Sequence, residues 1–416
     1  MKCRKTLLAL TLLGATLSAG AQKKDFTIKW YGKVEADWYY NSRTNAEGME
    51  GLFLAYPKDK VLDKKGKDLN ASQTAGTYVM ETRLGMDVQG PDFLGAKSSG
   101  KIEFDFRGVG NDFFQLRLRH AYINLDWDKS SLLLGQTWHP LTVSMMPEVI
   151  NLNAGSPFQP FARAPQLRYV YTDKTFKFTA AALWQSQDVS IAPANNKVGS
   201  TATTRSTLPL RNGCFPEVFA GADLRLSPHF TFGAGLHFSH FVPRVISENG
   251  TDTYKVSESV NSLTASAHFK YTYNMFSFSG KTVLGQNFTE ANGLGGYGIT
   301  GTDAITGEQK YTPLRTHTVW FNLAYGKTWR PSLYLGYLKN LGASKEVTGV
   351  LANGAALDKM TVATLSLTYN RPSWKIGAEY SYTTAWYGDE FDKKHKAVKS
   401  HDVGNHRLFL CTAFFF

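Results

Sequence analysis

The sequence predicts an all-β protein: a transmembrane antiparallel β-barrel of about 16 strands with an inward-folded constriction loop. Three observations indicate this fold. Segments in which apolar and polar residues alternate recur along the chain. Long and short connections join these segments in turn. After residue 22 no apolar run reaches the ~18 residues of a membrane helix, whereas a tilted membrane strand needs only ~9–11.

The first strand shows the alternation most clearly. Between Phe26 and Tyr40 every second residue is apolar or Gly, and most of the intervening residues are polar. Trp30 lies toward one end of the apolar face, and Trp38 and Tyr40 lie at the other. Aromatic residues at both ends are typical of a strand anchored at two membrane interfaces. A soluble sandwich has no need of them.

The same pattern recurs in 15 further segments, which gives an even number of strands. The expected strands are 26–40, 78–89, 101–109, 115–127, 131–138, 166–172, 175–184, 216–226, 229–241, 257–272, 275–287, 315–327, 330–341, 360–370, 373–387 and 404–416. The apolar face changes side near His120, so we expect a β-bulge there. The apolar face of the last strand predicts that it pairs with the first and closes the ring.

The connections divide into two classes. The long ones are 41–77, 139–165, 185–215, 242–256, 288–314, 342–359 and 388–403, and tight turns such as 173–174 and 371–372 separate them. Long loops at one end and short turns at the other are typical of outer-membrane barrels. Both termini are then expected at the short-turn, periplasmic end.

The connection 139–165 differs from the other long loops. It contains five prolines, which rule out a regular hydrogen-bonded ladder. It is also rich in Phe, Leu, Met and Ile, and such side chains bury themselves rather than stay disordered in water. Loops of this length are usually functional or disordered. We therefore expect residues 139–165 to fold inward against a large cavity.

Residues 1–21 have the features of a secretory signal peptide. Lys2, Arg4 and Lys5 precede an apolar core over 6–17, and Ala-Gly-Ala at 19–21 forms a cleavage site. Residues 22–416 are then expected to form one barrel domain in the outer membrane of a Gram-negative cell, in contact with its lipid.

Charge and cysteine content exclude some functions. The chain has 46 basic and 34 acidic residues, a net charge of +12, spread along the strands rather than clustered. Nucleic acid is therefore not an expected partner. Cys214 and Cys411 lie far apart in sequence without metal-ligand spacing, and whether they pair stays open.

A barrel of 16 strands encloses a lumen too wide for side chains to fill, so inward residues line water. The inward charged residues singled out as pore-lining are Arg83, Arg107, Arg117, Arg119 and Arg168, with Arg163 in the loop and Glu148 opposing them. Arg117, Arg119 and Arg168 have few acidic neighbours on their own strands, which favours an anion-attracting row. The alternative is that these residues pair with carboxylates and only solvate the wall.

No catalytic, cofactor or metal site is expected. His139 has no second ligand at metal spacing, so we expect it to fix where the chain leaves the wall. A nucleophile elbow is absent, and His401-Asp402 alone is a weak catalytic signal. Two alternative functions stay open: an outer-membrane barrel hydrolase, and a surface-exposed structural or adhesin barrel.

Two short runs carry a family resemblance. Residues 117–122, RLRHAY, and 134–140, LGQTWHP, resemble DcaP-like and related substrate-preferring porins. The whole mature chain resembles trimeric porins of 16 strands in architecture, although no subfamily motif follows residue 185. The resemblance implies a homotrimer for passive diffusion of small hydrophilic solutes, a preference for small anions such as dicarboxylates, and a third long loop folded into the lumen. Phe416 resembles the terminal aromatic assembly signal of such barrels.

Overall fold

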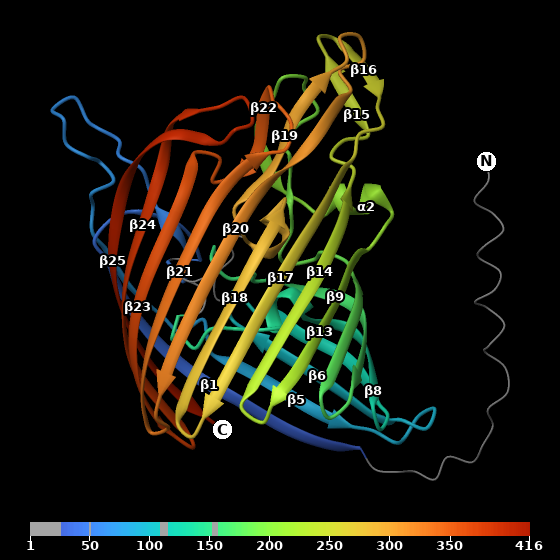
Figure 1. The fold of residues 1–416 in the computed structure, drawn as a ribbon, viewed down its shortest axis with the longest axis vertical. Coiled ribbons are helices and arrows are strands. Elements are labelled where there is room, and N and C mark those ends of the chain that lie inside the picture. The colour runs from blue at the N-terminus through green and yellow to red at the C-terminus, as the bar shows by residue number, and fades with distance from the viewer. Residues whose placement is uncertain (1–25, 50, 109–114, 152–156) are drawn as a thin grey trace.

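The computed structural model describes residues 26–49, 51–108, 115–151 and 157–416. The signal-peptide prediction over residues 1–21 lies outside them. The strands form one closed wall, with the long loops at the top of Figure 1 and the short turns, together with the C terminus, at the bottom. In the described part of the chain, no helix has the length and apolar character needed to span a membrane.

Sixteen strands make the wall in the described residues, and every neighbouring pair is antiparallel. In order they are β1 (Thr27–Asn41), β5 (Arg83–Gln89), β6 (Lys97–Asp105), β7 (Arg117–Asp126), β8 (Ser130–Trp138), β9 (Arg163–Thr172), β10 (Phe176–Leu183), β13 (Glu217–Ser227), β14 (Phe230–Phe241), β17 (Val260–Tyr273), β18 (Phe276–Gln286), β20 (Gln309–Tyr325), β21 (Trp329–Ala343), β23 (Leu357–Arg371), β24 (Trp374–Phe391) and β25 (Ala397–Phe415). The all-β barrel prediction is confirmed. A short strand, β4 (Thr74–Tyr78), pairs with the upper half of β1.

Smaller elements lie in the long connections. They are the strand pairs β2 (Asn45–Gly48) with β3 (Phe53–Pro57), β11 (Ile191–Pro193) with β12 (Thr203–Arg205), β15 (Ile246–Asn249) with β16 (Asp252–Lys255), and β19 (Gly295–Thr302) with β22 (Gly349–Asn353), and the short helices α1 (Pro140–Val143), α2 (Leu208–Gly213) and η2 (Phe288–Ala291). Of these, α1 is the one at the start of the inward loop. The prediction of a long connection over 388–403 is wrong. β24 and β25 continue as a hairpin above the wall, where Glu390 pairs in register with Lys399.

The seam between the first and last strands closes the ring, as expected. Gly32 N–H donates to the carbonyl of Phe416 at 3.0 Å, and Phe416 N–H donates back to the carbonyl of Gly32 at 3.2 Å. A Cβ at Gly32 would lie 2.5 Å from the Phe416 ring, so the glycine leaves room for that ring. Closure removes the free sheet edge that would otherwise pair with other chains.

Deletion of Phe416 should lower the yield of assembled barrel, because it removes both hydrogen bonds and the ring that packs on Gly32. The fraction of heat-modifiable protein on gels measures assembly, and Phe93→Ala, an exposed aromatic of the β5–β6 turn, is the control. Molecules that do assemble should keep the parent conductance. Normal assembly of the truncated chain would contradict the role assigned to this residue.

The outer face of the wall is apolar around the ring. Trp30 is 61% exposed on β1, and exposed apolar side chains continue on the other wall strands, among them Leu134, Leu236, Leu335 and Ile376. On the opposite face of β1, Asp37 is only 2% exposed. A continuous apolar band of this extent marks a surface that meets lipid rather than water.

The expected β-bulge lies at Arg119. Glu103 pairs with His120 and Phe104 pairs with Leu118, which leaves Arg119 as the extra residue of β7. The bulge buries Arg119 and His120 together on the inner side. Cys214 is exposed and Cys411 is buried, and both are free thiols.

Candidate functional site

The connection from β8 to β9, residues 139–162 and here called L3, crosses the inside of the barrel. It begins with α1 and reaches the opposite wall, where the amide of Glu148 donates to Asn322 Oδ1 at 2.7 Å on β20. The amide of Ile150 donates to Glu379 Oε2 at 2.7 Å on β24. The prediction of an inward loop is confirmed, although L3 ends three residues before the expected boundary because β9 begins at Arg163.

Apolar packing holds L3 at both ends. Near its start, Leu141 packs with Leu183 and Phe288 in a buried cluster. Near its end, Phe158 packs with a larger buried cluster that includes Trp320. Full burial of each such side chain contributes about 1.5–3 kcal/mol. The composition that predicted an inward loop is therefore what anchors it.

Residues of L3 line charged cavities in the barrel, two of which are described here. The first, here called the arginine-side cavity, has a volume of about 490 Å³ and is lined by β1, β5, β6, β7 and β25 together with Met146 and Ile150 of L3. The second, here called the lysine-side cavity, has a volume of about 500 Å³ and is lined by β10, β13, β14 and β17 together with Ser144 and Met145. A solute in the lumen meets L3 from one side or the other.

Five arginines gather where β5 to β9 face L3, and they are here called the arginine cluster: Arg83, Arg107, Arg117, Arg119 and Arg163. Three carboxylates lie among them. Asp105 accepts from Arg117 at 2.6 Å and from Arg119 at 3.0 Å.

The other two carboxylates of the cluster are also paired. Glu103 accepts from Arg119 at 2.6 Å. Glu81 accepts from Arg83 at 2.8 Å and lies in close contact with Arg107. Four of the five arginines therefore have carboxylate partners. This agrees with the alternative in which the charged residues pair with each other and only solvate the wall.

Arg163 differs from the other four arginines. Its side chain is 1% exposed, its guanidinium lies 4.4 Å from the ring centre of Trp138, and its Nε and Nη1 make no hydrogen bond within the described residues. A guanidinium stays charged at physiological pH. Asp188, which accepts from the backbone amide of Arg163 at 2.9 Å, is a fourth carboxylate beside the cluster, so five guanidinium groups against four carboxylates give a net charge of +1.

The structure does not bring the remaining two expected residues into this cluster. Arg168 donates to Gln166 Oε1 at 2.8 Å and lines a separate cavity of about 230 Å³ beside Pro140 of L3. Glu148 forms an ion pair of 2.6 Å with Arg330 on β21, on the far wall. Glu148 therefore does not oppose the arginine cluster directly.

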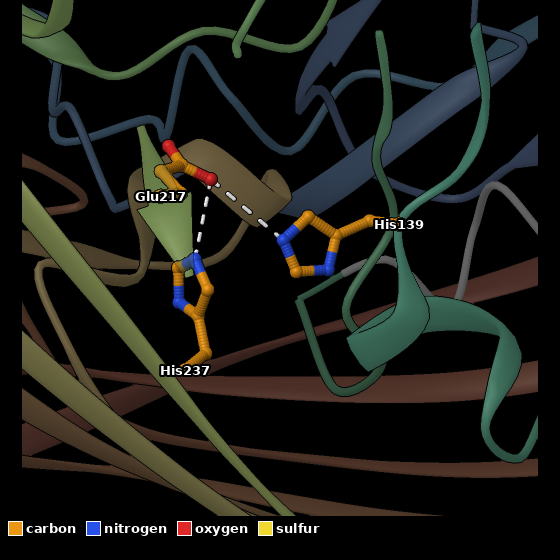
Figure 2. Close-up of side chains that lie close together, drawn as sticks. All are labelled: His139, Glu217 and His237. Atoms are coloured by element: carbon orange, nitrogen blue, oxygen red, sulfur yellow. Dashed lines mark hydrogen bonds and ion pairs between the residues drawn. The ribbon is translucent and has the colours of Figure 1, made fainter. Parts of the chain in front are cut away.

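Two groups of residues were missed in the sequence. The first group is the set of cations that line the lysine-side cavity: Lys174, Lys177, Arg225 and Lys270. Their position near the short turns was the feature of the sequence that could have identified them. The second group is His139, Glu217 and His237, which lie together in Figure 2. Wide spacing along the chain hides this group, because its members come together only when the start of L3 folds inward against β13 and β14.

Two loop residues have shifted pKa values: His139, which belongs to this second group, and Glu290, which lies beside it. Burial lowers the pKa of His139 to about 4, so its imidazole is neutral near pH 7. Burial, reinforced by the neighbouring Glu217, raises the pKa of Glu290 well above its ordinary value.

Comparison with known proteins shows that several solved outer-membrane proteins have a similar fold. The chain matches no protein-family model and no curated protein sequence. It is similar to the outer membrane channel DcaP of Acinetobacter baumannii, at 18% identity and a TM-score of 0.65 over 94% of this chain and 97% of that one. It is also similar to OmpT of Vibrio cholerae, at 13% identity and 0.56 over 95% and 99%. An anion-selective porin from Comamonas acidovorans matches at 10% identity and 0.51 over 94% and 100%.

Proposed function

We propose that this chain is an outer-membrane porin for passive diffusion of small hydrophilic solutes, that it favours anions, and that it works as a homotrimer. The observation that carries the proposal is a charge-lined lumen, narrowed by L3, inside a barrel with an apolar outer face. The DcaP channel and the Comamonas porin share this fold. One solved form of the Vibrio OmpT is a trimer, which supports the assembly.

The charge of both cavities supports a preference for anions. The arginine-side cavity is lined by five Lys and Arg side chains against four Asp and Glu, a net charge of +1. The lysine-side cavity is lined by four Lys and Arg against two Asp, a net charge of +2. In a narrow lumen of reduced dielectric, fixed charges act more strongly on ions than they do in bulk water.

The two alternative functions fit the structure less well. A hydrolase centred on His401 would need a free ring nitrogen to activate a nucleophile, but Nδ1 lies 2.6 Å from Asp389 and Nε2 lies 2.7 Å from Asp59. A structural or adhesin barrel would use its external loops, and it gives no reason for L3 to cross the lumen.

A planar bilayer tests the proposal. The purified protein should open stable channels, and in a potassium chloride gradient the reversal potential should indicate preferred passage of chloride. Absence of channels from correctly folded protein would reject the porin function. A cation-directed reversal potential would reject the anion preference alone.

Arg163→Met should lower the anion-to-cation permeability ratio, because Arg163 is the arginine of the cluster whose side chain makes no hydrogen bond within the described residues. Met keeps a flexible apolar stem against Trp138, so folding should be preserved. Reversal potentials at low salt give the ratio, and the effect should fade above ~0.1 M salt, where the screening length falls below ~10 Å. Arg371→Gln, an exposed arginine at a short turn, is the charge-matched control. A ratio equal to that of the control would place Arg163 off the permeation path.

A further inference from the structure

Three side chains converge where L3 leaves the wall (Figure 2). His139 is the first residue of L3, Glu217 begins β13, and His237 lies on β14. Glu217 Oε2 is 3.2 Å from His237 Nε2 and 3.7 Å from His139 Nε2. All three residues are at most 4% exposed. Two imidazoles thus share one buried carboxylate oxygen.

We propose that His139, Glu217 and His237 form a binding site for a divalent transition-metal ion of the zinc type, which ties the base of L3 to the barrel wall. Neighbouring ligand atoms of a tetrahedral zinc ion lie roughly 3.3–3.5 Å apart, given metal–ligand distances of about 2.0–2.1 Å. The distances of 3.2 and 3.7 Å bracket this separation. Two imidazole nitrogens favour zinc over calcium and magnesium, which take oxygen ligands, and a carboxylate is a common third ligand of zinc.

The surroundings orient the ligand atoms. Gln185 donates to Oε1 of Glu217, which leaves Oε2 to face the two histidines. On the other side of His237, Nδ1 lies 3.9 Å from Oε1 of Glu290, a carboxylate on η2. At that distance Glu290 makes no hydrogen bond to the ring, but it lies on the side where a ligating histidine usually has its outer carboxylate partner.

An unpartnered polar atom points independently to a missing cation. His139 Nε2 is buried and makes no hydrogen bond within the described residues. Proteins rarely keep a buried polar atom without a partner, because its lost hydrogen bond to water is then not replaced. An ion bonded to His139 Nε2 would satisfy that atom and offset the buried charge of Glu217.

Binding also has a consequence for L3. His139 Nδ1 accepts the amide hydrogen of Leu141 at 3.0 Å, so a neutral ring carries its proton on Nε2. A metal ion at Nε2 requires that proton to move to Nδ1, where it displaces the Leu141 hydrogen bond. The occupied site therefore replaces the hydrogen bond that caps α1 with a metal bond to the wall.

Metal content tests the proposal. Untagged full-length protein is extracted from outer membranes of cells grown with added zinc, and its metal is measured by mass spectrometry. The parent should carry close to one zinc per chain, and Glu217→Gln and His237→Gln should each lower this at least tenfold. His268→Gln is the matched control, because His268 is a buried histidine 2.7 Å from Asp223 on the same wall. The control should keep the parent zinc content.

Cobalt substitution provides a second readout that does not depend on the variants. Parent protein refolded with cobalt should show the visible absorption bands of a four-coordinate ion, and added zinc should bleach them. Heat-modifiable mobility on gels shows which variants have folded. A folded parent without zinc and without these bands overturns the proposal, as do folded variants with parent zinc content. Both readouts are independent of conductance, so they stand apart from the porin proposal.

Discussion

Shortening L3 between Val143 and Phe158 is expected to raise single-channel conductance several-fold and to weaken discrimination between solutes. L3 runs from β8 to the opposite wall and lines both charged cavities, so its removal should widen the lumen. The shortened chain should be made in a Glu379→Gln background. Otherwise the carboxylate of Glu379, which accepts from the amide of Ile150 at 2.7 Å, would be left buried without that partner.

Single-channel recording and liposome swelling with sugars of graded size measure the two effects. Glu379→Gln alone is the first control, and shortening of the exposed loop over 59–71 at the rim is the second. Both controls should conduct as the parent does. Unchanged conductance after shortening L3 would mean that solutes do not pass along it.

The wall could be predicted from the sequence because one physical rule governs it. Each strand has an apolar face toward lipid and a polar face toward the lumen, so alternation locates all 16 strands, with ends that differ by up to seven residues, as at the start of β25. The rule fails above the rim, where both faces meet water. The hairpin that pairs Glu390 with Lys399 has no apolar face, and the sequence therefore suggested a loop over 388–403.

The candidate site was less predictable because it depends on strand register and on the path of L3. Arg117 and Arg119 have few acidic neighbours on their own strand, β7, which suggested that they are unpaired. Their carboxylate partners lie on the neighbouring strand, β6. The bulge at Arg119 adds a further shift of one residue. Arg168 lines a different cavity from Arg119, and no local sequence pattern indicates which cavity a wall residue faces.

The two histidines of the buried group could not be predicted because they lie far apart in sequence. His139 and His237 are 98 residues apart, and their rings come within 4.9 Å only after β8, β13 and β14 close into the wall. A search for ligands at short spacing cannot find such a group. Buried ionisable residues that are far apart in sequence become neighbours only in the folded barrel.

The second large effect concerns Asp105, the carboxylate shared by several arginines of the cluster. It is 0% exposed and lies 2.6 Å from Arg117, 3.0 Å from Arg119 and 3.7 Å from Arg107. Removing one partner of a buried ion pair typically costs about 3–5 kcal/mol. Arg117→Met and Asp105→Asn should therefore both lower the free energy of unfolding, measured by urea titration of the protein in detergent.

The two substitutions should act oppositely on selectivity. Arg117→Met lowers the net charge of the arginine cluster by one and should shift the reversal potential toward cations, whereas Asp105→Asn raises it by one and should shift it toward anions. The double variant restores the parent charge, so its selectivity should return to that of the parent. Its loss of stability should also be smaller than the sum of the single losses, since the two residues are in contact. Shifts of the same sign in both single variants would show that the charge of the arginine cluster does not set the selectivity.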